Sequence, residues 1–159
     1  MTTPPALRLD PHVVAFLARG VAIVAATRDA DLQPEITRAW GPAVAQDGAA
    51  VTLCLGDPPG ARTRANLERN GAIAATFSLP TTYRGVQLKG TATAVGEPTE
   101  TDLERMREHV AAFADEVAQV GIAPGRAMRF LDDRVLAVTF TVAEVYDQTP
   151  GPRAGAVLG

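Results

Sequence analysis

The sequence is poor in the residues that build disulfide-linked or metal-held proteins. It has one cysteine, Cys54, which excludes a disulfide within the chain, and two histidines, His12 and His109. So few thiolate and imidazole ligands argue against a zinc centre, and we expect no metal site. Cys54 lies in the apolar segment VTLCL and is expected to be buried and unreactive. Neither histidine has an acidic or hydroxyl partner at motif spacing, so we assign neither a catalytic role.

Long apolar runs and an excess of positive charge are also lacking. No apolar run approaches the roughly 18 residues of a membrane-spanning helix, and the start MTTPPALRLD lacks the charged head and apolar core of a signal peptide. The net charge of −3 gives no broad surface for nucleic acid or an anionic membrane. We therefore expect a soluble, cytoplasmic protein in which any anion-binding site is built from a few local residues.

Apolar runs of strand length dominate what is present. They span 21–27, 35–45, 49–55, 72–78, 84–95 and 135–146. Asp47-Gly48 accepts the positive φ angles of a tight turn, so we expect the second and third runs to pair antiparallel. Pro42 cannot donate to a sheet ladder and predicts a bulge or an edge nearby.

The run 84–95 alternates as a strand covered on one face requires. One face would hold Val86, Leu88, Gly90, Ala92 and Ala94. The other would hold Gln87, Lys89, Thr91 and Thr93. Gln87 and Lys89 could contact a ligand's heteroatoms or simply face water, and the pattern leaves both interpretations open.

Helix signals separate some of these runs. In 10–20, Asp10 can cap the helix, Pro11 suits its first position and Gly20 suits a left-handed exit. In 101–121, Thr101 and Glu104 are spaced as a capping box. The apolar stripe of that helix consists of Leu103, Met106, Val110, Phe113, Val117 and Val120. A further short helical segment is expected near 125–131.

The order of these elements predicts a fold that is mainly β with inserted helices. Hairpin connections imply an antiparallel sheet, and about six strands favour a closed or split barrel over a doubly wound parallel sheet. We expect a single domain over 1–149, beginning with a loose arm at 1–9, and a Pro/Gly-rich tail at 150–159.

The segment RTRANLERNG places cationic and hydroxyl groups at the start of a short helix, 61–70, which ends at Asn70-Gly71. A helix N-terminus with arginine forks and a hydroxyl suits an anion such as phosphate. The candidate anion-binding residues are Arg62, Thr63, Arg64 and Asn66. On spacing alone, arginines that are merely solvated on a surface helix are the favoured alternative.

Arg38 and Trp40 stand two residues apart and so share one face of a strand. They could bind a planar anionic ligand, or the arginine could cover the indole through a cation–π contact as plain structure. The second interpretation is favoured, because most lone tryptophans serve packing.

The segments QPEITRAW, VTLCL, GARTRANLERNGAIAATF and TTYRGVQLKGTATAV resemble the pyridoxamine 5'-phosphate oxidase-like family of FMN-binding split barrels. The resemblance covers about residues 15–95. It implies a six-stranded antiparallel split barrel that forms a homodimer with FMN at the subunit interface. By the same resemblance, Arg38, Arg62 and Thr63 would hold the FMN phosphate. Flavin-edge contacts would come from Ala39, Trp40, Thr52 and Leu53, and from the segment Gly85 to Gln87.

Three departures from the family pattern predict weakened FMN binding. Thr63 stands where the family prefers lysine, Gly85 replaces a polar residue, and the basic residue that often ends the second strand is missing near Pro42. Each lost charge-assisted hydrogen bond costs about 1.5–3 kcal/mol. The tail QTPGPRAG also lacks that oxidase's substrate-binding segment, which argues against pyridoxamine phosphate oxidation itself.

The leading hypothesis is an FMN-dependent oxidoreductase for a small-molecule substrate. Two alternatives remain: a non-catalytic flavin-binding module, and a split barrel that uses F420 or haem instead of FMN. Haem is disfavoured because neither histidine lies on the strands expected to face the ligand.

Overall fold

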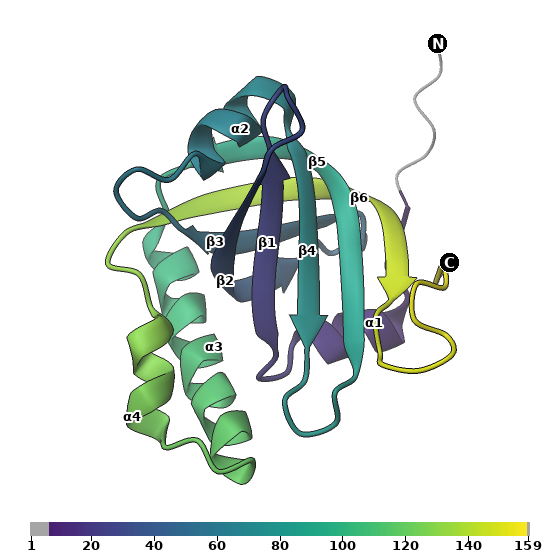
Figure 1. Ribbon diagram of the computed structural model, residues 1–159, viewed down its shortest axis with the longest axis vertical. Helices are drawn as coiled ribbons and strands as arrows, with labels where there is room; N and C mark the ends of the chain where they lie inside the picture. The colour runs from purple at the N-terminus through teal and green to yellow at the C-terminus, as the bar shows by residue number, and fades with distance from the viewer. Residues whose placement is uncertain (1–6, 159) are drawn as a thin grey trace.

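In the computed structural model, which describes residues 7–158, six strands form a closed antiparallel barrel (Figure 1). In order around the wall they are β1 (Ala22–Arg28), β2 (Pro34–Val44), β3 (Ala50–Gly56), β6 (Val135–Asp147), β5 (Gly85–Gly96) and β4 (Ala72–Ser78). Every neighbouring pair is antiparallel, including the closing pair of β1 with β4. The predicted six-stranded antiparallel barrel of the split-barrel type is confirmed.

The core lies inside the barrel because alternate side chains of each strand turn inward. Fully buried inward residues include Ala25, Ala39, Leu53, Phe77, Leu88 and Phe140. This core continues into α1 (Pro11–Leu17), whose Phe16 and Leu17 are buried with it. Asp10 accepts a hydrogen bond from the His12 N–H and Pro11 opens the helix, as predicted.

The other helices lie outside the wall. α2 (Thr63–Asn70) and α1 lie toward opposite ends of the barrel, and α3 (Glu100–Gln119) packs mainly on β2 (Figure 1). α4 (Pro124–Ala127) and the short 3-10 helix η1 (Met128–Phe130) follow α3. A second cluster between α3 and the wall buries Trp40, Val110, Phe113, Ala114, Val117 and Ala127. In Figure 1 no helix covers the outer side of β1, β4 and β5.

The predicted turns form where expected. β2 and β3 are joined through Asp47-Gly48, where Gly48 has a φ of 74° and its N–H donates to the Ala45 carbonyl at 2.8 Å. The β2–β3 register shifts between Trp40 and Ala43, which confirms the bulge expected at Pro42.

Two expectations about helix ends are wrong. The capping box of α3 is formed by Thr99 and Asp102, two residues earlier than the predicted Thr101 and Glu104. The Asp102 N–H donates to Thr99 Oγ1 at 3.2 Å, and the Thr99 N–H donates to Asp102 Oδ2 at 2.8 Å. Gly20 does not have a positive φ; a side chain there would instead collide with the Ala112 carbonyl of α3.

Two members of the predicted apolar faces are exposed. Val120 lies beyond the end of α3, where the chain turns at Gly121 with a φ of 88°. Ala94 faces solvent because the β5–β6 register shifts between Ala92 and Ala94, which brings Val95 against the core instead.

The chain ends pack more closely than predicted. Leu9 is buried and its N–H donates to the Gly48 carbonyl at 2.9 Å, whereas residues 1–6 of the predicted arm lie outside the described part. The tail turns back, so that Val157 pairs with Tyr146 and the Leu158 N–H donates to the Val145 carbonyl at 2.8 Å. Within residues 7–158, no helix has the length and apolarity needed to span a membrane.

Candidate functional site

The start of α2 supplies unpaired backbone donors. Arg62 occupies the N-cap position, and within residues 7–158 no side chain caps the first N–H groups of the helix. Such a helix start carries a partial positive charge and free donors. At the other end Gly71 adopts the left-handed conformation, with a φ of 68°, so the predicted Asn-Gly stop is confirmed.

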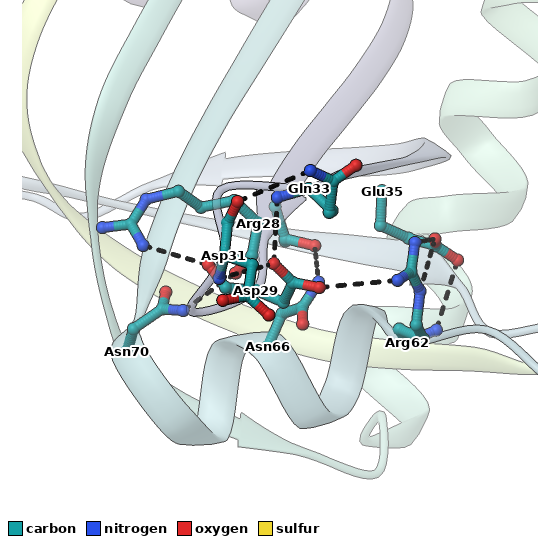
Figure 2. Close-up of polar contacts among 9 residues, drawn as sticks. Arg28, Asp29, Asp31, Gln33, Glu35, Arg62, Asn66 and Asn70 are labelled. Atoms are coloured by element: carbon teal, nitrogen blue, oxygen red, sulfur yellow. Dashed lines mark hydrogen bonds and ion pairs between the residues drawn. The ribbon is translucent and has the colours of Figure 1, made fainter.

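Arg62 is bound to two carboxylates (Figure 2). Its Nε and Nη2 donate to Glu35 Oε2 at 3.3 and 3.2 Å, and its own backbone N–H donates to Glu35 Oε1 at 3.2 Å. Its Nη1 lies 3.5 Å from Asp29 Oδ2. The positive charge of this guanidinium is therefore balanced by groups of the chain itself.

The same region joins α2 to the turn between β1 and β2 (Figure 2). Asp29 Oδ1 accepts hydrogen bonds from the N–H groups of Asp31 and Gln33, both at 2.9 Å. Asn66 Nδ2 donates to Thr27 Oγ1 at 3.1 Å. No local sequence pattern connects this acidic turn with Arg62, because the two lie in segments that are far apart in the chain.

Thr63 is the first residue of α2 and is 1% exposed. Its hydroxyl has no hydrogen-bond partner among the described residues. A buried polar group without a partner is costly, and among the described residues Trp40 Nε1 and His109 Nε2 are in the same state.

Arg64 and Asn66 do not complete a cationic cradle with Arg62. Arg64 Nη2 donates to Glu97 Oε1 at 2.8 Å, and its Nη1 lies 3.8 Å from Glu68. Asn66 is buried and occupied by its bond to Thr27. Of the four predicted anion-binding residues, Arg62 and Thr63 lie at the start of α2, whereas Arg64 is paired with carboxylates and Asn66 with Thr27.

Arg38 and Trp40 share the outer face of β2, as predicted, but they do not pair. Trp40 is buried beneath α3 with its ring edge-on to Phe113, at 5.5 Å between centroids. The Arg38 guanidinium lies 4.2 Å from the ring centroid of Phe130, in η1. The interpretation of Trp40 as a packing residue is confirmed, and the cation–π partner of Arg38 is Phe130. No hydrogen bond or ion pair joins Arg38 to the Arg62 cluster in the described chain.

Other predicted contacts divide between the two faces of the wall. Ala39 and Leu53 are buried in the barrel core, so only their backbone atoms can face outward. Thr52 lies on the outer face and shares a hydrogen bond with Thr139, 2.8 Å between hydroxyl oxygens. Gln87 Nε2 donates to Thr76 Oγ1 at 2.9 Å.

The C-terminal tail covers Gly85, at the start of β5. The Gly85 N–H donates to Thr149 Oγ1 at 3.1 Å, and a Cβ at Gly85 would lie 3.1 Å from the Gln148 backbone. The absence of a polar side chain at Gly85 thus coincides with a chain segment that occupies its place.

The histidine and cysteine on the α3 side are buried. His109 Nδ1 accepts a hydrogen bond from the Gly41 N–H at 3.1 Å, and burial lowers the pKa of His109 to about 4, opposed by the Val21 backbone. Cys54 is buried as predicted, and this burial, with the Asp102 carboxylate adding to it, raises the pKa of the thiol to about 11, so that it stays protonated near neutral pH. Across residues 7–158, no cluster of three or more histidine, cysteine or acidic side chains could hold a metal ion.

Comparison with known proteins places these features in a family. A family model described as pyridoxamine 5'-phosphate oxidase matches residues 9–147. A search of proteins with curated functions finds no match.

Several solved structures share the fold. HupZ of Group A Streptococcus is 19% identical, with 92% of this chain and 99% of that chain covered and a TM-score of 0.54. An F420 reductase is 15% identical, covering 82% and 93% of the two chains, with a TM-score of 0.55. An FMN-binding protein from Syntrophomonas wolfei is 12% identical, covering 83% and 80%, with a TM-score of 0.52. At these identities the likeness establishes the fold alone.

Proposed function

The chain belongs to the pyridoxamine 5'-phosphate oxidase-like family of FMN-binding split barrels, and from this premise we propose that it is an FMN-dependent oxidoreductase with a small-molecule substrate. The family model spans 139 residues (9–147), and these include all six strands of the barrel. Among solved proteins of the same fold are one described as FMN-binding and one as an F420 reductase.

The single observation that carries the cofactor assignment is the hydroxyl of Thr63. In the described part of the chain it is buried and without a partner, at the first residue of a helix that no side chain caps, where an FMN phosphate would accept hydrogen bonds. Arg62, beside it, would supply a guanidinium fork once the Glu35 carboxylate is displaced from it. The residues at the start of α2 thus fit a phosphate, with Arg62 shared between the ligand and the chain.

FMN, when bound, supplies hydride and electron transfer; the protein's part is to bind and orient it. The side chains of Arg38, Thr52 and Gln87 would contact the flavin from the outer face of the wall. Trp40, below α3, would act through packing, and Ala39 and Leu53 through their backbone atoms. We assign no acid–base residue. His109 and Cys54 are buried, and their pKa values of about 4 and about 11 lie outside the neutral range.

We further propose that two copies associate with the cofactor between them. The outer side of β1, β2 and β4 leaves apolar side chains uncovered: Val24 is 38% exposed and Ile36 is 68% exposed. Small residues of β4, Ala72 and Ala74, lie beside them in the wall. A contiguous apolar face of this kind is typical of an interface.

An F420-dependent oxidoreductase is the second candidate. The side chain of F420 joins its deazaflavin through a phosphodiester, which carries one negative charge where the FMN monoester carries nearly two. A guanidinium already balanced by Glu35 and Asp29 suits the smaller charge. The F420 reductase of the same fold adds support for this candidate.

The proposal is tested by titrating the purified protein with FMN, riboflavin, F420 and haemin, followed by difference absorbance. We expect a flavin spectrum with FMN, and bleaching of its band near roughly 450 nm by NADH or NADPH under anaerobic conditions. A bound flavin that no nicotinamide reduces would favour a non-catalytic flavin-binding module. Binding of F420 in preference to both flavins would assign the second candidate, and binding of none would refute the proposal.

A further inference from the structure

We infer that Glu35 is a specificity-determining residue: its carboxylate occupies the position at the start of α2 that a ligand's terminal phosphate would take. This inference rests on the proposed function and deepens it. It concerns how strongly the chain distinguishes a phosphorylated flavin from one without a phosphate.

The contacts of Glu35 are those of an anion at a helix start. One oxygen, Oε1, accepts the backbone N–H of Arg62 at 3.2 Å. The other, Oε2, accepts Nε and Nη2 of the same residue at 3.3 and 3.2 Å. A phosphate at this place would use the same donors, a backbone N–H of the helix start and an arginine fork. Glu35 thus acts as an internal anionic ligand (Figure 2).

Glu35 differs from Asp29 in how firmly it is held. Asp29 Oδ1 is fixed by two backbone N–H groups of its own turn, so its ion pair with Arg62 belongs to the turn structure. In the described chain the Glu35 carboxylate bonds to Arg62 alone. Its side chain is 23% exposed and that of Arg62 is 52% exposed, so the pair is open to water and can exchange at little cost.

The consequence is a competition between carboxylate and phosphate. FMN must displace Glu35 from Arg62 and then remain next to the displaced negative charge, whereas riboflavin has no phosphate and meets neither cost. The wild-type chain should therefore prefer FMN over riboflavin only weakly. Glutamine at this position keeps the size of the side chain and removes its charge.

The experiment measures dissociation constants for FMN and for riboflavin by quenching of flavin fluorescence, with the wild type, Glu35→Gln and Glu97→Gln. The last is a matched control, because Glu97 holds Arg64 at 2.8 Å in the way that Glu35 holds Arg62. We expect Glu35→Gln to tighten FMN binding by about tenfold and to leave riboflavin within twofold. Glu97→Gln should change neither constant by more than twofold.

Other outcomes separate this inference from the proposed function. If both flavins bind but their ratio of constants is the same in the wild type and in Glu35→Gln, the inference is wrong and the function stands. An equal gain in FMN affinity in Glu97→Gln would also overturn it, because the effect would then come from the loss of any negative charge near α2 and not from Glu35 itself. If no variant binds either flavin, the proposed function fails and the inference with it. Should Glu35→Gln fold poorly, Glu35→Ala is expected to give the same gain for FMN.

Discussion

At the scale of single residues, the start of α2 shows which candidate site residues the sequence can predict and which it cannot. Arg62 and Thr63 could be selected from the sequence because a basic and hydroxyl pair opening a helix is a local pattern. Glu35 could not be selected, because it reaches Arg62 from 27 residues away and only once the turn between β1 and β2 lies over α2. Local chemistry therefore suggests candidate donors at the start of α2, whereas the contact of Glu35 with them depends on tertiary folding.

Arg62→Ala tests the phosphate role. We expect FMN affinity to fall about tenfold, while riboflavin affinity stays within twofold, because only FMN has a phosphate to lose. The matched control is Arg64→Ala, which removes an arginine bound to Glu97 and Glu68 on the same helix. Isothermal titration with both flavins gives the constants. Equal weakening of FMN and riboflavin by Arg62→Ala would contradict a contact to the phosphate.

We expect His109 to make the free energy of unfolding depend on pH. Burial lowers its pKa to about 4 in the folded chain, whereas an unfolded histidine titrates near 6.5. Protons therefore bind the unfolded state more tightly, so this contribution is fully present above about pH 6.5 and is lost as the pH falls toward 4. The difference corresponds to roughly 3 kcal/mol.

The measurement is urea unfolding at pH 7 and pH 4.5 for the wild type and His109→Gln, in which an amide oxygen can still accept the Gly41 N–H. We expect the wild type to lose more stability on acidification than the variant. Carboxylates titrate in both proteins, so their contribution cancels in the comparison. The same loss in both would show that His109 is not the source.

At the scale of elements, the features that the sequence predicts correctly are mostly those that depend on residues close together in the chain. The Asp47-Gly48 turn, the bulge at Pro42 and the end of α2 at Gly71 each depend on the residues present at that point. The register shift near Ala94 could not be read in this way, because it arises from the pairing of β5 with β6 across the sheet. Strand closure by β1 and β4 is likewise a property of the whole chain.

The N-terminus of α3 provides a test at this scale. Thr99→Ala removes the hydroxyl that accepts the Asp102 N–H, and we expect it to lower the free energy of unfolding by about 1 kcal/mol. Thr101→Ala is the control, since Thr101 is an exposed residue within the first turn of α3. Urea denaturation at pH 7 measures both. A larger loss of unfolding free energy for Thr101→Ala than for Thr99→Ala would show that Thr101 caps the helix, as the sequence predicted.

At the scale of the whole molecule, the helices cover the barrel unevenly. α3 and α4 lie on one side, and the outer side of β1 and β4 has no helix in front of it (Figure 1). Val24 and Ile36 are exposed on the outer side of the neighbouring strands β1 and β2. A barrel of this size gains stability and solubility by covering such a face with a second copy. The cofactor site proposed for the outer wall would then be completed by the partner.

We therefore expect sedimentation of the wild type as a dimer at micromolar concentration. Ile36→Glu places a charge in the proposed interface. It should raise the dissociation constant of the dimer at least tenfold and so favour the monomer. Tyr83→Glu is the control, because Tyr83 is also exposed but lies in the loop between β4 and β5 and not on a strand of this face. If Ile36→Glu remained dimeric while Tyr83→Glu dissociated, the interface would lie elsewhere. If the Ile36→Glu monomer bound flavin as tightly as the wild type, the cofactor would be held by one subunit alone.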